Sequence, residues 1–81
     1  MSPDRIKKMR NDLELTQESL AEALGVAKLT ISQYETGYRR PNKTVLILFV
    51  ILESFSKKKA LDLINEFRKI SQRIKKDENE E

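Results

Sequence analysis

The chain has 81 residues and a formal net charge of +3, which is enough for one domain with a small core. It contains no cysteine and no histidine, so disulfides, thiolate or imidazole metal sites and the usual nucleophile–base pairs are excluded. We therefore expect no enzyme, no metal and no cofactor. No secretory signal is visible, and the longest apolar run, residues 45–52, is too short to span a bilayer, so we expect a cytoplasmic protein without a membrane partner.

The charge is distributed unevenly along the chain. Residues 1–44 carry eight Lys or Arg and six Asp or Glu (+2), residues 45–76 carry eight and three (+5), and residues 77–81 contribute −4. A basic body suits a polyanionic partner whose binding weakens as salt rises, although solvated surface charge would give the same pattern. The acidic tail 77–81 is expected to be disordered.

A helix is predicted to begin at Ser2-Pro3-Asp4. Ser2 can cap the helix, proline suits its first position, and an aspartate stabilises the positive end of the helix dipole. The residues expected along one face are Ile6, Met9, Arg10 and Leu13.

Two short helices separated by a glycine turn are predicted between Thr16 and Gly37. Thr16 would cap a helix over 17–24, Gly25 would stop it, and a second helix would run from about 27 to 35. This layout is typical of a DNA-binding helix-turn-helix, while a helical hairpin without a ligand is the alternative. The polar side chains that could reach phosphates and base edges are Gln17, Lys28, Ser32 and Gln33.

An extended basic loop at 38–41 leads into a helix predicted from Asn42 or Lys43 to Glu53. Its eight consecutive apolar residues predict burial on all sides, so one side needs the last helix or a second subunit as partner. A buried strand over the same residues is the alternative, because Val, Ile and Phe favour strands.

The last predicted helix runs from Lys57 to Lys75 or Lys76 and carries one apolar stripe. It could fold back on the domain or pair with its copy in a dimer. Together with the apolar helix before it, the stripe supplies the side chains that we expect at a dimer interface. These are Val50, Phe67, Ile70 and Ile74.

Residues 4–53 resemble the lambda-repressor-like, or Xre-type, helix-turn-helix domain. The similarity is carried by the segments LTQxxLAxxLGV at 15–26, ISxYExG at 31–37 and RRP at 39–41. It implies an all-α fold of five helices, the last of which is an extended C-terminal helix. We expect a DNA-binding domain at 1–53, an amphipathic helix at 54–76 that extends the core or dimerises, and the acidic tail at 77–81.

The resemblance also implies roles for individual residues. The helix near 27–35 would enter the major groove, with Lys28, Leu29 and Gln33 facing bases and Ser32 as a further candidate. An ion pair between Arg10 and Glu35 would tie the first helix to the third. The residues expected at phosphates are Gln17, Thr36, Tyr38, Arg39, Arg40 and Lys43.

Two positions depart from the family pattern. Family members often have Ser or Thr where this chain has Ala27, which weakens the helix cap by about 1 kcal/mol. Leu29 is apolar where many members have a polar side chain, so it either contacts a thymine methyl group or belongs in part to the core.

Small bacterial or phage regulators and the DNA-binding half of some antitoxins are the members that the pattern resembles most. We therefore expect a sequence-specific regulator of transcription, a repressor or autoregulator, that binds a palindromic operator in double-stranded DNA as a homodimer. The alternative is a protein–protein adaptor or antitoxin-like module, in which the two apolar helices bind a toxin or another regulatory protein and DNA binding is secondary.

Overall fold

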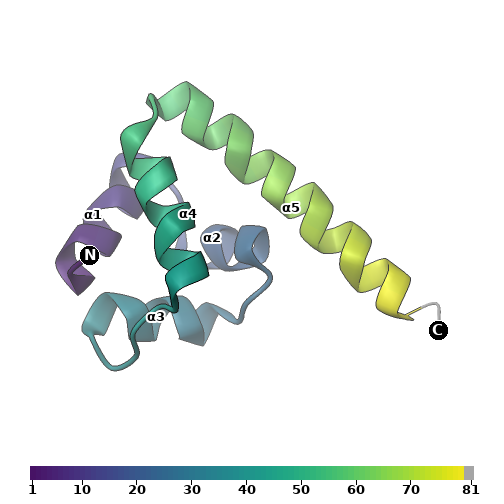
Figure 1. Cartoon of the computed structure of the whole chain (residues 1–81), viewed down its shortest axis with the longest axis horizontal. Helices are drawn as coiled ribbons and strands as arrows, with labels where there is room; N and C mark the ends of the chain where they lie inside the picture. Colours follow the sequence, from purple (N-terminus) through teal and green to yellow (C-terminus); the bar gives the residue numbers. More distant parts are fainter. Residues whose placement is uncertain (80–81) are drawn as a thin grey trace.

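Residues 1–79 fold into five helices joined by short loops (Figure 1). The structure is a computed structural model that describes the backbone of residues 1–79 and the side chains of residues 1–74. The helices are α1 (Pro3–Asp12), α2 (Gln17–Leu24), α3 (Lys28–Thr36), α4 (Lys43–Ser54) and α5 (Lys57–Asn79). This confirms the predicted all-α, five-helix fold. The alternative of a strand at 45–52 is wrong, because these residues form most of α4.

Local hydrogen bonds set the helix starts. The side chains of Ser2, Thr16 and Asn42 each accept a hydrogen bond from the backbone N–H three residues ahead, at 3.2, 3.0 and 3.0 Å respectively. Helix α3 differs, because Ala27 at its N-cap has no side chain that could accept such a bond. Ser56 caps α5 in the same way and accepts from the Lys59 N–H at 3.4 Å, so four of the helix starts are fixed by a side chain and that of α3 is not.

Glycines in the left-handed region end α2 and α3, with φ +70° at Gly25 and +82° at Gly37. A Cβ on Gly25 would also lie 3.0 Å from the Oγ of Ser71, where α5 passes over the turn. Gly25 is thus required both for the turn and for the close approach of α5.

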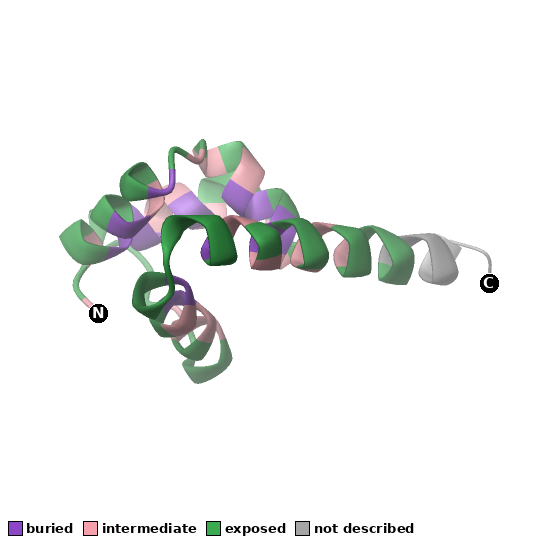
Figure 2. Ribbon diagram, turned by 90° about the horizontal axis from the view of Figure 1, so that it is seen from above, coloured by how far each residue is buried: buried purple, intermediate pink, exposed green. Residues whose placement is uncertain are grey.

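One core lies between the helices (Figure 2). It joins α1–α4 to the first half of α5, and the Tyr34 ring meets the Phe49 ring edge-to-face with 6.2 Å between centroids. Between Asn65 and Ile74, no residue of α5 is buried. The largest fully buried side chains of the described residues are Ile6, Leu20, Ile31, Phe49, Leu52 and Ile64.

Helix α4 is not buried on all sides within one chain. Phe49 and Leu52 face the core, but Ile47 is 50% exposed and Val50 is 44% exposed. The other helices pack against one side of α4 and leave the other side open to solvent, so the last helix does not cover that side; the alternative, a second subunit, stays a prediction.

Helix α5 extends to Asn79, beyond the predicted end at residue 75 or 76. The sequence after Lys57 has no glycine or proline to stop it. The tail that we expected to be disordered at 77–81 therefore includes helical residues at 77–79, while 80–81 lie outside the described residues. Among the described residues, none of the helices has the length and apolar character needed to cross a membrane.

Candidate nucleic-acid interface

Helices α2 and α3 form a tight helix-turn-helix. Ala21 is 3% exposed on the buried side of α2, and a small residue there allows the two helices to approach closely. After the turn, the Val26 N–H donates to the Ala21 carbonyl at 3.0 Å, which satisfies a carbonyl at the end of α2. The turn therefore presents α3 in a fixed orientation relative to α2.

Helix α3 has one buried face and one accessible face. Ile31, Tyr34 and Glu35 point into the protein. The four residues expected to contact bases are outside this buried set: Lys28 and Leu29 are exposed, whereas Ser32 and Gln33 are partly buried. Leu29 is 65% exposed, so the alternative in which it belongs to the core does not apply.

The basic loop after α3 is attached to the end of that helix. The Arg39 N–H donates to the Gln33 carbonyl at 3.2 Å, and the Thr36 hydroxyl donates to the same carbonyl at 3.3 Å. Thr36 is exposed, as are the other residues that we expected near phosphates. These are Tyr38, Arg39 and Arg40 in the loop and Lys43 at the first position of α4.

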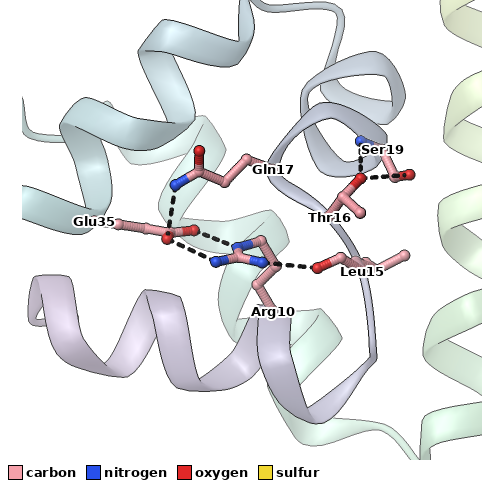
Figure 3. A network of polar contacts seen from close by, with 6 residues as sticks. All are labelled: Arg10, Leu15, Thr16, Gln17, Ser19 and Glu35. Atoms are coloured by element: carbon pink, nitrogen blue, oxygen red, sulfur yellow. Dashed lines mark hydrogen bonds and ion pairs between the residues drawn. The ribbon is translucent and has the colours of Figure 1, made fainter.

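A buried ion pair connects α1 to α3 (Figure 3). The guanidinium of Arg10 binds the carboxylate of Glu35 through two contacts, Nε to Oε2 at 2.6 Å and Nη2 to Oε1 at 3.0 Å. Its Nη1 also donates to the Leu15 carbonyl at 2.8 Å, just before α2 begins. Only 11% of the Arg10 side chain and 3% of the Glu35 side chain is exposed. The pair thus fixes α1, the start of α2 and α3 together.

Gln17, the first residue of α2, joins the same network. Its Nε2 donates to Glu35 Oε1 at 3.2 Å, so the amide nitrogen points toward the interior (Figure 3). An amide nitrogen has two hydrogens, and one bond to Glu35 leaves the second for another acceptor. The sequence did not predict this contact, because nothing in the spacing of residues 17 and 35 shows where a glutamine side chain turns.

The network sets the ionisation of Glu35. Burial raises the pKa of the carboxyl group, but hydrogen bonds from Arg10 and Gln17 and the positive charges of Arg10 and Lys7 outweigh it. The pKa of Glu35 therefore lies below its ordinary value, and the carboxylate is charged at neutral pH.

Helices α4 and α5 carry exposed apolar side chains. Ile70 and Ile74 are 46% and 53% exposed, and with Phe67 they line a groove of about 890 Å³ beside the end of α2. Val50 does not line this groove. Of the four residues expected at a dimer interface, the structure thus places three in the groove and one on α4. Ile47, which is also exposed on α4, was not among the residues expected at the interface, although the run of apolar residues in α4 indicated that some of them would remain exposed.

Comparison with known proteins supports the assignment of the α2–α3 unit. A family model described as helix-turn-helix matches residues 6–50. The HTH-type transcriptional regulator AnsR of Bacillus subtilis (strain 168) is 36% identical over 52 residues, which cover 64% of this chain and 45% of that protein. The match thus spans less than half the length of this relative. No solved structure matches the chain.

Proposed function

The chain belongs to the lambda-repressor-like, Xre-type helix-turn-helix family, and on this premise we propose that it is a repressor or autoregulator of transcription. It would bind a palindromic operator in double-stranded DNA as a homodimer, in the cytoplasm where that DNA lies. The main observation that supports this proposal is the accessible face of α3, which combines polar side chains with a basic loop attached to its end. The protein acts by occupying DNA or recruiting another protein, without chemistry of its own.

Helix α3 reads the major groove in this proposal. Gln33 can donate to and accept from an adenine edge, a pairing that is worth roughly 1–3 kcal/mol of discrimination. Lys28, at the first position of the helix, reaches guanine O6 and N7 or a phosphate, and Ser32 bonds to whichever base is nearest. Leu29 completes the set of base contacts.

Phosphates on either side of the groove are held by groups that flank α3. The second amide hydrogen of Gln17 lies at the positive end of α2, where backbone N–H groups also favour an anion. The DNA backbone beyond the other end of α3 is held by Thr36, by the exposed loop residues Tyr38, Arg39 and Arg40, and by Lys43 at the start of α4. These contacts set the position of the protein without reading sequence.

Two copies would associate through the apolar surface of α4 and α5. Val50, Phe67, Ile70 and Ile74 contribute to it, and burying them removes apolar area from water. A two-fold dimer presents two copies of α3, which read half-sites about one helical turn, or about 10 base pairs, apart.

The same apolar surface favours one other candidate function, an adaptor that binds a toxin or another regulatory protein. In that case the isolated chain is a monomer with exposed Ile47, Val50, Ile70 and Ile74. Its DNA binding would be weak and secondary.

Selection from a random double-stranded DNA pool at about 150 mM salt tests the proposal. We expect enrichment of an inverted repeat with half-sites about one turn apart. The control is the Gln33→Ala variant, which should fold like the parent but enrich a less defined sequence. Recovery of unenriched DNA, with binding that disappears as salt rises, would contradict sequence-specific regulation and favour the adaptor.

A further inference from the structure

Leu29 is the most exposed large aliphatic side chain among the described residues, at 65%. It is the second residue of α3 and comes two positions before Ile31, the first buried residue of the helix. Single exposed aliphatic side chains are common on protein surfaces, so it is the position of Leu29 on the accessible face of α3, together with its exposure, that points to a ligand.

The surroundings of Leu29 do not resemble a protein-binding surface. Its neighbours on the accessible face, Lys28, Ser32 and Gln33, are polar, and the groove of α2 and α5 does not include it. Protein interfaces have a continuous apolar centre, whereas this face has a single apolar side chain between hydrogen-bonding ones. Such a mixture matches the floor of the DNA major groove, where polar base edges alternate with one type of apolar group.

That apolar group is the C5 methyl of thymine, the only methyl group that unmodified DNA presents in the major groove. The first turn of a recognition helix is the part that contacts base edges. In α3 this turn begins with Ala27, which is exposed and has no hydroxyl, and continues to Leu29. Leu29 is thus the one large exposed apolar side chain in the part of α3 that would contact base edges.

We propose that Leu29 specifies a thymine in each half-site by packing against its C5 methyl group. The inference rests on the proposed function, because it requires α3 to lie in the major groove. Cytosine lacks this methyl group, and purines present a polar N7 edge that Leu29 cannot satisfy, so both are disfavoured at this position.

The test uses the duplex recovered by selection from the random pool. Each thymine of a half-site is replaced in turn by deoxyuridine, which pairs identically but lacks the methyl group, and affinity is measured by fluorescence anisotropy. Removing one buried methyl group is expected to weaken binding about fourfold for each half-site, at one position only. The Leu29→Ala variant is expected to bind the thymine and deoxyuridine duplexes equally at that position.

Two variants serve as controls. Leu29→Met keeps an apolar side chain of similar size and should keep the preference for thymine. Phe55→Ala removes an exposed apolar side chain that belongs neither to α3 nor to the proposed dimer surface and should also keep it.

The outcomes separate this inference from the function on which it rests. An enriched repeat that tolerates deoxyuridine everywhere, or that contains no thymine, overturns the role of Leu29 and leaves the regulator intact. A thymine preference that survives in Leu29→Ala also overturns it. Failure to enrich any sequence overturns the proposed function and the inference together.

Discussion

In the α1–α3 half of the molecule a buried ion pair fixes how the helices meet, whereas the α4–α5 half is held by apolar packing together with more exposed ion pairs such as Arg5–Glu53 and Lys57–Glu14. Arg10 and Glu35 make two directed contacts, and Gln17 adds a third. On α4 and α5, Ile47, Val50, Ile70 and Ile74 remain exposed after folding.

The difference shows how a small domain can serve two purposes. Hydrogen bonds between charged groups are directional, so they set the angle of α3 relative to α1 and keep its accessible face in place. Apolar contacts are not directional, and surplus apolar area can be buried against another molecule. The half with the ion pair is suited to precise reading, and the apolar half is suited to association.

The largest expected effect comes from breaking the ion pair. Glu35→Ala leaves Arg10 as an unpaired buried charge and should lower the free energy of unfolding by about 3–5 kcal/mol, measured by urea denaturation. By contrast, Gln33→Ala on the accessible face should weaken DNA binding and leave the unfolding curve nearly unchanged. Equal losses of stability in the two variants would contradict a structural role specific to Glu35.

A charge on the apolar half should affect association more than folding. If the proposed dimer forms, Ile70→Asp should convert it to a monomer in sedimentation equilibrium and weaken operator binding at least tenfold, which is about 1.4 kcal/mol. Arg73→Asp, at an exposed neighbouring position on α5, should leave the dimer intact. A wild-type chain that stays monomeric at every concentration would rule out the dimer and favour an adaptor.

The N-terminus of α3 offers a smaller test, because Ala27 cannot accept a capping hydrogen bond there. Ala27 has φ −73° and ψ 149°, close to the values of the capping residues Ser2 and Thr16. Ala27→Thr should therefore add a cap and raise the free energy of unfolding by about 1 kcal/mol. Ala27→Val has the same shape without the hydroxyl and should give no such gain; a gain of equal size in both variants would show that capping is not its cause.

The smallest effect concerns pH. Because the pKa of Glu35 is lowered in the folded protein, its charged form contributes stability above the ordinary glutamate value of about 4.3, and this contribution is lost as the pH falls below it. Thermal melts between about pH 3 and 6 should show a steeper acid loss in the wild type than in Glu35→Gln. Parallel curves would mean that other carboxylates dominate, such as Glu14 and Glu53, whose pKa values are lowered by ion pairs with Lys57 and Arg5.

Helix starts and stops could be predicted from the sequence because the bonds that set them are local. A cap joins residues three apart, as between Asn42 and Val45, and a glycine stop depends on one residue. The accessible face of α3 could be proposed in advance for the same reason, since a period of 3.6 residues separates Ile31, Tyr34 and Glu35 from the rest. The missing stop after residue 76 shows the limit of this approach, because no local signal marks the end of α5.

The sequence by itself determined the helices, their order and the family pattern, since each depends on residues that are near neighbours along the chain. Only the tertiary structure decided that Leu29 is exposed, that Gln17 turns toward Glu35 and that one side of α4 remains open. Burial and side-chain direction depend on residues distant in the sequence, such as Ser71 over Gly25, and local propensities carry no information about which distant residues meet.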